Sequence, residues 1–517
     1  MSFALCAFSP RCFCYEAKNS SRVVIKPALD RPPSRDGLVA DDGLSVDGVV
    51  NYFSIDFGLC FIAFFSLYWG ICWRSVRLQN AMLLLASYAI LASLRLDFLY
   101  VLLGYTGLVY ALGRLSERRP GRRINYALIL LLVLGCFYLF KYQDFIVSGL
   151  QNTLLGLGLN ASVPMIELLL PVGLSFYIFH SISYLVSINR RERTAGSLFD
   201  LALYLAFFPS LIAGPVNRAA ALLPQIRATT HRKVLEPRRA LGLIALAVVK
   251  LFFLSTWLGN EWVDPVFATP GSHSPAQILL SVYGYSFQIY FNFSGYTNLV
   301  TGMALLLGFR LPLNFNYPYA SRNLKEFWER WHISLSQFIR DYVYIPLGGN
   351  RRGVLRSHLN MLLAMLISGL WHGASMNFII WGALHGVGMV VYKLFSQWFP
   401  RRTSSTGAAV FTRLLTFHYV AFAWIFFRSA TLDDACDMLS GLTGLSPGAL
   451  LGNTGVELLA CLCFVMLYPA WVAMIRKAFA VSTRLPWPVY PVLLGLFIFL
   501  IIFVSPSGVP GFIYASF

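Results

Sequence analysis

Charged side chains are scarce in this chain. Only 12% of its 517 residues are Asp, Glu, Lys or Arg, and 57% are hydrophobic, whereas ordinary soluble domains carry about 25% charged residues. Alternating segments of about ten residues, which a membrane β-barrel requires, are also missing. The composition therefore excludes a soluble globular protein and favours an all-α, polytopic integral membrane protein.

A soluble basic domain is missing as well, although the net charge is +18. The basic residues gather instead in short loops between apolar runs, at 114–123, 227–239 and 351–356. Short loops rich in Lys and Arg are typical of the cytoplasmic side of a membrane protein. We therefore assign most of these loops to the cytoplasm. We expect no nucleic-acid partner, since binding of that kind needs a basic domain surface.

Motifs that hold metals or disulfides are equally absent. The nine cysteines are scattered, and the spacing of Cys12 and Cys14 matches no common zinc or redox motif. No His-Glu-x-x-His or comparable ligand spacing occurs. We expect neither a disulfide framework nor a bound metal or other resident cofactor.

Long apolar runs dominate the rest of the chain. A helix that spans the hydrocarbon core needs about 17 to 25 such residues, and because several runs are short or broken the sequence predicts roughly ten to twelve crossings. The candidate spans are 57–73, 80–93, 96–112, 125–140, 166–188, 199–213, 240–258, 277–291, 296–308, 355–371, 376–395, 410–427, 456–474 and 488–504.

The first fifty residues differ from the remainder. Residues 1–50 contain a Pro-Pro pair and several aspartates but no apolar run of useful length. The apolar core of a signal peptide is therefore missing from them. We interpret 1–50 as a polar, disordered N-terminal extension and 51–517 as the transmembrane domain.

A Trp-His pair occurs twice, as Trp331-His332 and Trp371-His372. The second pair ends the uncharged run 359–371, and residues 373–375 after it can break a helix. An ionisable residue at bilayer depth is costly unless it is used, and short broken helices commonly line a membrane cavity. A neutral imidazole can take a proton from a hydroxyl. We expect His372 to be a general base; the alternative is a histidine that only hydrogen-bonds a backbone carbonyl.

The first pair lies in a segment that predicts an amphipathic helix over 325–342. At helical spacing, Trp328 and Leu335 belong to an apolar face, and His332 falls on a polar stripe. Such a helix would lie at the membrane interface or line a polar passage. The alternative is that His332 simply belongs to a solvated face.

A glycine-rich basic turn follows at 344–352, with the sequence Tyr-Ile-Pro-Leu-Gly-Gly-Asn-Arg-Arg. Backbone N–H groups in such a turn, together with arginines, can bind an anionic group such as phosphate. Asn350 and Arg351 are therefore candidate substrate-binding residues.

Several longer motifs occur along most of the chain after the N-terminal extension. They are Lys325-Glu-Phe-Trp-Glu-Arg-Trp-His332-Ile-Ser-Leu-Ser, Phe338-Ile-Arg-Asp-Tyr-Val-Tyr-Ile-Pro-Leu-Gly-Gly-Asn350-Arg, Gly369-Leu-Trp-His372-Gly-Ala-Ser, Leu170-Pro-Val-Gly-Leu-Ser-Phe-Tyr, Phe207-Phe-Pro-Ser-Leu-Ile-Ala-Gly-Pro215, Gln288-Ile-Tyr-Phe-Asn-Phe-Ser-Gly-Tyr296 and Gly511-Phe-Ile-Tyr. Together, these motifs resemble the membrane-bound O-acyltransferase family, and within it the branch that O-acetylates bacterial alginate.

The resemblance implies an acyl-transfer cavity inside the bundle. It assigns His372 as the catalytic histidine and His332 as the second catalytic motif residue. Within the same motifs we add Trp371, Ser375 and Arg330 to the candidate substrate-binding residues.

The resemblance also implies the reaction and its setting. The family moves an acyl group from a thioester donor, such as acetyl-CoA as co-substrate, to a hydroxyl. Members of this branch place acetyl on an extracytoplasmic polysaccharide such as alginate. They work with a periplasmic acetyltransferase or a partner resembling an SGNH hydrolase. The expected location is the bacterial inner membrane.

The chain departs from the usual pattern of that branch at four positions. Asn292, Asn298 and Ser187 stand where aspartate is common, and His180 stands where glutamine is. Each missing carboxylate removes a possible partner for an arginine or an imidazole. The departures leave open whether acceptor or partner specificity has changed.

Other readings of the sequence remain. A transporter or flippase for lipid-linked saccharides would also have many spans and broken helices, and D-alanyl transfer to teichoic acid is a rival within the enzyme class. A serine nucleophile at Ser375 is disfavoured because no Gly-x-Ser-x-Gly elbow occurs. His385 can hydrogen-bond within the bundle, and Lys250 either snorkels or faces a cavity.

Overall fold

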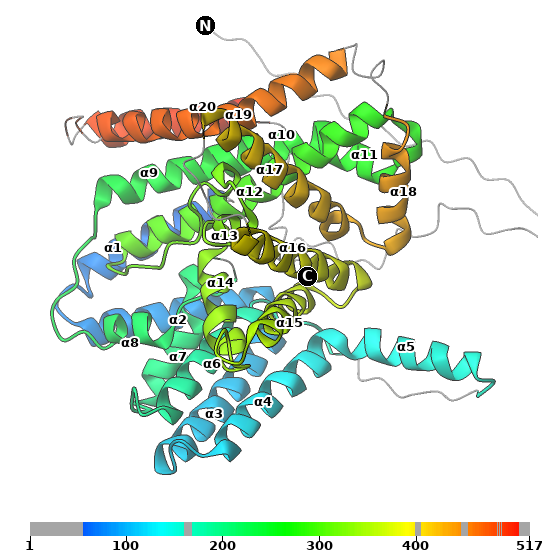
Figure 1. Ribbon diagram of the computed structural model, residues 1–517. Helices are drawn as coiled ribbons and strands as arrows, with labels where there is room; N and C mark the ends of the chain where they lie inside the picture. The colour runs from blue at the N-terminus through cyan, green and yellow to red at the C-terminus, as the bar shows by residue number, and fades with distance from the viewer. Residues whose placement is uncertain are drawn as a thin grey trace, which may run out of the picture. The chain divides into compact units, whose positions relative to one another are not determined.

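The computed structural model describes residues 55–159, 168–212, 214–398, 405–445, 453–482, 484, 486 and 489–505 (Figure 1). Every regular element among these residues is a helix, which confirms the predicted all-α class. The predicted extension at 1–50, with Cys12 and Cys14, lies outside the described residues, as does the Gly-Phe-Ile-Tyr motif at 511–514.

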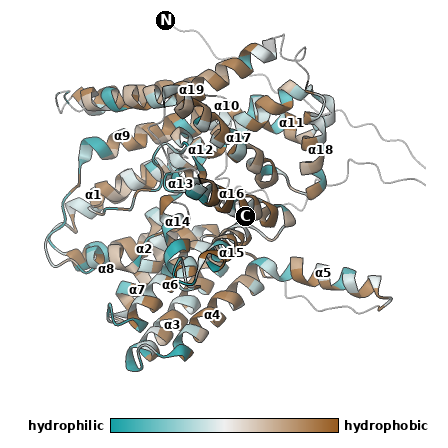
Figure 2. Ribbon diagram, in the orientation of Figure 1, coloured by the Kyte–Doolittle hydropathy of each residue, from teal (hydrophilic) through white to brown (hydrophobic). Residues whose placement is uncertain are grey.

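Eight helical runs among the described residues are long and apolar enough to cross a membrane. They are Val76–Leu94, Leu96–Arg118, Arg123–Gly156, Pro237–Ala268, Val354–His372, Met376–Trp398, Thr406–Arg428 and Thr454–Ala478. Figure 2 shows hydrophobic residues along most of these helices. The chain is therefore a multi-pass membrane protein. The number of crossings, roughly ten to twelve, stays a prediction, since shorter apolar helices are also present.

The first part of the chain provides a scaffold for one side of the site. Its elements are α1 (Ile55–Gly70), α2 (Val76–Leu94), α3 (Leu96–Arg118), α4 (Arg123–Phe137), the π-helix η2 (Tyr138–Tyr142), α5 (Gln143–Gly156), α6 (Leu174–Asn189), α7 (Leu198–Ala206) and η3 (Phe208–Ser210). Helix α3 packs against α2, α6 and α7. The predicted span 166–188 is helical only from Leu174, because the described residues before it form a loop.

The second part contains the remaining helices. They are α8 (Ala219–Ile226), α9 (Pro237–Val248), the π-helix η4 (Val249–Ser255), α10 (Thr256–Leu258), the π-helix η5 (Gly259–Val263), α11 (Asp264–Ala268), η6 (Pro270–Ser272), α12 (Pro275–Leu306), η7 (Pro318–Ala320), α13 (Leu324–Trp328), α14 (Ile333–Ile339), the π-helix η8 (Arg340–Tyr344), α15 (Val354–His372), α16 (Met376–Trp398), α17 (Thr406–Arg428), α18 (Leu432–Leu442), α19 (Asn453–Ser482) and α20 (Val489–Val504).

Helix α12 corrects one prediction. The sequence suggested two spans, at 277–291 and 296–308, but a single helix of 32 residues covers both. Asn292 and Ser294 interrupt the hydropathy in the middle of the helix, yet both are buried. A Cβ at Gly295 would lie 2.6 Å from the side chain of Leu251, so η4 approaches α12 closely there. The helix continues because its polar middle packs against protein.

Helices α15 and α16 form a tight antiparallel pair around the second Trp-His pair. Small residues at their interface allow the two backbones to approach: a Cβ on Gly382 would lie 2.6 Å from the carbonyl oxygen of Met365. Helix α17 packs against α16 and α12. This arrangement fixes the end of α15 inside the bundle.

The predicted continuous helix over 325–342 is wrong. Helix α13 ends at Trp328, and α14 begins at Ile333 after a break at the first Trp-His pair. His332 itself has a φ of 41°, in the left-handed region. The neighbouring segment supplies the reason, since Ile333 N–H donates to the carbonyl of Asn314 at 2.8 Å. Tertiary hydrogen bonds thus replace part of the helical ladder.

Candidate active site

His372 is the last residue of α15, and Gly373 leaves the helix in an extended conformation. Helix α16 begins at Met376, so three residues, 373–375, separate the two helices. The sequence had predicted a break at this place, and the structure confirms it. The His372 side chain is only 4% exposed. The break therefore places an imidazole at a helix end within the bundle.

Aromatic rings surround the His372 imidazole. Its centroid lies 5.0 Å from the ring of Trp381 and 4.9 Å from that of Phe427, both edge-on. The ring of Phe378 stacks on it at 6.2 Å. These residues come from α16 and α17. Because buried aromatic surfaces exclude water, electrostatic interactions at His372 are stronger than at a wet surface.

His332 is buried as well, at 1% exposure. The alternative that His332 belongs to a solvated face is therefore wrong, and the continuous helix that carried the predicted polar stripe is broken at this residue. The left-handed backbone at His332 turns the side chain inward. Its Nδ1 atom lies 3.0 Å from Oδ1 of Asn314, a residue that the sequence analysis did not single out.

The hydrogen bonds around Asn314 determine the tautomer of His332. The hydroxyl of Ser334 accepts a hydrogen bond from the backbone N–H of Val216 at 2.9 Å and donates one to Asn314 Oδ1 at 2.7 Å. Because that oxygen can only accept, Nδ1 of His332 carries the hydrogen and Nε2 carries the lone pair. Nε2 is buried and has no hydrogen-bond partner among the described residues. When the imidazole of His332 is neutral, Nε2 is therefore its acceptor atom.

The two Trp-His pairs, forty residues apart in sequence, meet in one aromatic cluster. The ring of Trp371 lies 4.7 Å from that of His372 and 6.2 Å from that of His332. On the other side, Trp331 contacts Trp424 at 5.0 Å. The structure therefore places Trp371 between the two predicted catalytic histidines.

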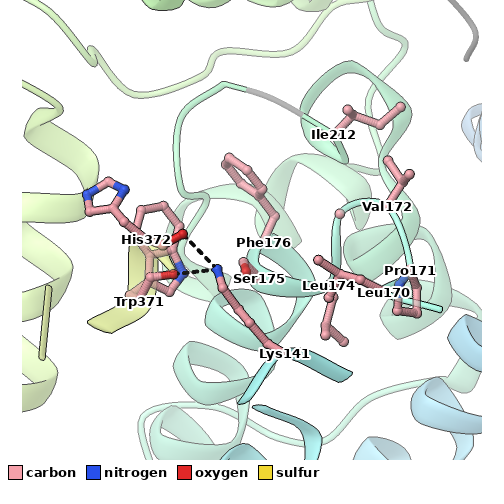
Figure 3. Close-up of a pocket in the computed structure, with 11 residues that line it drawn as sticks. Lys141, Leu170, Pro171, Val172, Leu174, Ser175, Phe176, Ile212, Trp371 and His372 are labelled. Carbon is pink, nitrogen blue, oxygen red and sulfur yellow. Dashed lines mark hydrogen bonds between the residues drawn. The ribbon is translucent and has the colours of Figure 1, made fainter. Parts of the chain in front are cut away.

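A small cavity of about 70 Å³ lies beside His372 (Figure 3). Trp371 lines it, as predicted for a substrate-binding residue, and the loop before α6 lines it from the opposite side. Gly173 ends that loop with a φ of 81°, and a Cβ there would lie 2.5 Å from the carbonyl oxygen of Leu211. The Pro-Val-Gly-Leu-Ser motif at 171–175 is therefore a tightly packed wall of the cavity.

Lys141 also lines this cavity, and the sequence analysis missed it. Its Nζ donates to the carbonyl oxygens of Trp371 at 2.7 Å and of His372 at 3.1 Å. The predicted span 125–140 ended one residue earlier, so Lys141 looked like an ordinary charge flanking a span. The one sequence signal that pointed to Lys141 was its position as a cation directly after an apolar run.

A larger cavity, of about 490 Å³, lies between α13, α14, α15 and α16. It reaches Ser368, one helical turn before His372 on α15. Its lining residues are Lys325, Trp328, Leu335, Ser336, Ile339, Arg340, Tyr344, Asn350, Met361, Ala364, Met365, Ser368, Met389, Tyr392, Lys393 and Ser396. The lining combines methionine and aliphatic side chains with three cationic ones.

Asn350, a predicted substrate-binding residue, accepts several hydrogen bonds at this larger cavity. Its Oδ1 accepts from Tyr344 at 2.6 Å, from Ser357 at 2.7 Å and from Lys393 Nζ at 3.2 Å. Lys393 also donates to Ser357 at 2.7 Å. Among the described ion pairs, none provides Lys393 with a carboxylate. Its positive charge is therefore available for an anionic ligand.

Three other predicted substrate-binding residues line neither cavity. Arg330 forms an ion pair with Glu326 at 2.8 Å, and Ser375 accepts from the backbone N–H of Asn377 at 3.2 Å in the turn before α16. Arg351 is exposed in the basic turn. Arg330 and Ser375 thus have local structural partners.

His385 and Lys250 occupy interior positions. The ring of His385 lies 4.9 Å from Trp381, and neither ring nitrogen has a hydrogen-bond partner among the described residues, so the expected hydrogen bond within the bundle is not found. Lys250 lies on η4, with its Nζ 5.5 Å from the ring of Tyr290 on α12. Lys250 therefore points into the protein. Groups of three or more potential metal ligands do not occur in the described part of the chain.

Comparison with known proteins adds the following relationships. The model of the membrane-bound O-acyltransferase family matches residues 174–433. A probable alginate O-acetylase from Pseudomonas syringae pv. tomato is 37% identical over 389 residues, which cover 73% of each chain. A peptidoglycan O-acetyltransferase from Helicobacter pylori is 34% identical over 394 residues, 70% of this chain and 73% of that protein. A teichoic acid D-alanyltransferase from Bacillus subtilis is 30% identical over 251 residues, 44% of this chain and 61% of that protein. The region matched by the family model includes both histidines and the whole lining of the larger cavity, whereas Lys141 and residues 170–173 of the small cavity lie before it.

Proposed function

The chain belongs to the membrane-bound O-acyltransferase family and is an O-acyltransferase, and from that premise we propose that it moves an acetyl group from a cytoplasmic thioester donor towards the hydroxyls of an extracytoplasmic polysaccharide. Alginate or a similar exopolysaccharide is the proposed acceptor. The alginate and peptidoglycan O-acetylating relatives support this acceptor class, because each covers most of the chain. The proposed location is the bacterial inner membrane.

The observation that carries the proposal is that one helix, α15, contributes residues to both cavities, with His372 at the small one. The small cavity touches His372 directly, and the larger one reaches Ser368, one turn earlier on the same helix. A transfer enzyme must bring two substrates to one base, and binding them in separate cavities would let each approach without displacing the other. The aromatic cage would keep water from competing with the acceptor hydroxyl.

His372 is the proposed general base. Its neutral imidazole takes the proton from an acceptor hydroxyl while the oxygen attacks the thioester carbonyl carbon. The carbonyl π electrons move to oxygen, which gives a tetrahedral oxyanion. The carbon–sulfur bond then breaks, and the departing thiolate receives the proton from the imidazolium. The products are an acetyl ester and a free thiol.

His332 is the proposed second catalytic residue. Asn314 holds its Nδ1–H, so that Nε2 can accept a hydrogen bond from a substrate group. The ring of Trp371 lies between it and His372. We assign His332 to orienting a substrate group near Trp371, with His372 as the base.

The larger cavity is the proposed donor site. A thioester donor such as acetyl-CoA carries phosphate groups on a long flexible arm. Lys393 and Arg340 would bind a phosphate, and the methionine side chains would contact the arm, since Met adapts to irregular ligands. The arm would then extend along α15 towards His372.

The acceptor polymer is the proposed substrate on the opposite side of the membrane. We propose that a periplasmic acetyltransferase or a partner resembling an SGNH hydrolase receives or places the acetyl group there. The D-alanyl transfer reading is weaker, because the corresponding relative matches only 44% of this chain. If the chain were a transporter, replacing His372 would reduce polymer export rather than acetylation.

The experiment is to express His372→Ala in the producing cell and to measure both the acetyl content and the amount of exported polymer. His231→Ala, at an exposed histidine outside both cavities, is the matched control. The proposal expects loss of acetylation with continued export for His372→Ala and no change for His231→Ala. Normal acetylation, or loss of export with the acetyl content of the residual polymer unchanged, would contradict it.

A further inference from the structure

Lys141 is a cation at the His372 cavity to which the mechanism above gives no role. Its Nζ contacts backbone oxygens of Trp371 and His372 (Figure 3). The ion pairs found among the described residues do not include it. Asp144 shares a neighbouring cavity of about 350 Å³ with Lys141, without an ion pair between them. A positive charge is therefore held beside His372 by neutral groups alone.

The local structure around Lys141 is specialised. It lies in the π-helical turn η2, and π-helical turns are frequent at functional sites. The next residue, Tyr142, donates its hydroxyl hydrogen to the carbonyl of Leu370. Two consecutive side chains thus bind the last three carbonyls of α15, where a cation also interacts favourably with the helix dipole. This contact fixes the backbone that carries His372.

Anchoring alone does not require a charge. Tyr142 performs the same task with a neutral hydroxyl, whereas an ammonium group inside a membrane protein is costly. An ammonium group has three N–H donors, and the carbonyls of Trp371 and His372 use two. The third remains for a group in the small cavity, which Lys141 and His372 both line.

We propose that Lys141 is a catalytic residue of the acyl-transfer site, whose ammonium group stabilises the oxyanion formed when the acceptor hydroxyl attacks the thioester. This inference rests on the proposed function. In the step it supports, the carbonyl oxygen gains the electron pair of the C=O bond and lies in the small cavity. His372 holds the proton taken from the hydroxyl. Lys141 keeps its own proton throughout and offers a preorganised charge-assisted hydrogen bond.

The test compares three variants of the full-length protein, purified in detergent and supplied with a labelled acetyl thioester, an acceptor polysaccharide and a periplasmic extract of the producing cell, which provides the proposed partner. Lys141→Gln keeps N–H donors for the carbonyls of Trp371 and His372 but removes the charge. Lys141→Arg keeps the charge. Tyr142→Phe removes only the neighbouring anchor on Leu370 and is the matched structural control.

The expected result is a kcat for Lys141→Gln that is lower by about 10²-fold, with an unchanged KM for the donor and an unchanged thermal unfolding temperature. Lys141→Arg should retain more of the kcat than Lys141→Gln, and Tyr142→Phe should lower the unfolding temperature while losing less of the kcat than Lys141→Gln. A wild-type kcat in Lys141→Gln, or an equal loss in Tyr142→Phe, would overturn the proposal.

The two proposals fail in different ways. If the wild-type protein transfers no acetyl group from a thioester to a hydroxyl, the proposed function is wrong and the role of Lys141 falls with it. If the wild-type protein is active and Lys141→Gln is equally active, only the role of Lys141 is wrong. Should Lys141→Gln not fold, Lys141→Arg decides alone: a kcat as low as that of His372→Ala would overturn the proposal, and retained activity would support it.

Discussion

Nδ1 of His332 lies 3.0 Å from Oδ1 of Asn314, and this contact determines which atom of the imidazole can accept a proton. The hydroxyl of Ser334 donates to the same oxygen, so the oxygen has two donors and the imidazole has one tautomer. Nε2 is left as a buried acceptor. An asparagine in the loop before η7 thus orients a histidine that the sequence pattern places on the polar stripe of an amphipathic helix.

Replacing Asn314 should disturb the orientation and the tautomer of the His332 imidazole. In Asn314→Leu the Nδ1–H of His332 loses its acceptor, and the ring can rotate or change tautomer. We expect transfer activity to fall by at least about tenfold, as when other groups that orient a histidine are removed. Thr297→Val is the matched control, because Thr297 contacts the amide nitrogen of Asn314 at 3.4 Å on the side away from His332. Equal activity in the two variants would show that the tautomer is unimportant.

The cationic side chains that line the larger cavity should strengthen binding of the donor. Lys393→Met removes one charge-assisted hydrogen bond to a donor phosphate, and the KM for the donor should rise by about tenfold with little change in kcat. Arg356→Met provides the control, since Arg356 is exposed on α15 and does not line the cavity. The difference between the variants should shrink at high salt. A KM that is the same for both would argue against a donor in this cavity.

The close approach of α15 and α16 should make Gly382 intolerant of a side chain. A Cβ there would lie 2.6 Å from the backbone oxygen of Met365, so Gly382→Ala should lower the free energy of unfolding by about 1–3 kcal/mol. Gly407→Ala is the opposite case, because nothing lies within 4 Å of its Cβ position in α17. That variant should be neutral or more stable by up to about 1 kcal/mol. Thermal unfolding in detergent measures both, and equal effects would contradict the packing.

Asp341 in η8 should make part of the stability dependent on pH. Burial raises the pKa of its carboxyl, but hydrogen bonds and charge from Arg340 and Arg218 outweigh burial and leave the pKa lowered. A group with a lowered pKa in the folded state stabilises the protein above its unfolded pKa of about 3.9 and loses that contribution as the pH falls further. Unfolding temperatures measured from pH 6 to pH 3 should therefore fall less steeply for Asp341→Asn than for the wild type. Parallel curves would exclude this contribution.

The part of the site that follows from local sequence was predictable. Residues 359–371 are uncharged and residues 373–375 are weak helix formers, so the end of α15 at His372 could be inferred from composition and spacing alone. The burial of His372 followed from the same argument. The glycine and arginine spacing of the basic turn also drew attention to Asn350, which lines the larger cavity, while its binding of substrate stays a prediction.

Contacts between distant segments were not predictable. Asn314 lies 18 residues before His332, and Lys141 lies 230 residues before Trp371. Nothing in their own neighbourhoods distinguishes them from an ordinary loop asparagine or an ordinary cation at the end of a span. The break between α13 and α14 has the same origin, since the hydrogen bond from Ile333 to Asn314 overrides a sound helical pattern.

Of the residues expected to depart from the pattern of the alginate branch, His180, Ser187 and Asn292 are buried and Asn298 is half-buried. His180 is buried, and its Nε2 accepts from the backbone N–H of Asn217 at 3.2 Å. Ser187 donates to the carbonyl of Tyr184 at 2.8 Å. With its amide oxygen turned towards Lys250, Asn298 accepts a hydrogen bond from Nζ of Lys250 at 3.1 Å. In this orientation Lys250 donates to a neutral amide.

The most direct test is the rate at which purified protein, supplemented with a periplasmic extract of the producing cell, transfers labelled acetyl from a thioester to an added polysaccharide, compared between the wild type and His372→Gln. The variant keeps a polar side chain of similar size but provides no base. The account predicts transfer by the wild type and a rate for His372→Gln that is lower by at least about 10²-fold, with an unchanged unfolding temperature. Transfer at the wild-type rate by folded His372→Gln would contradict the assignment of His372 as the base.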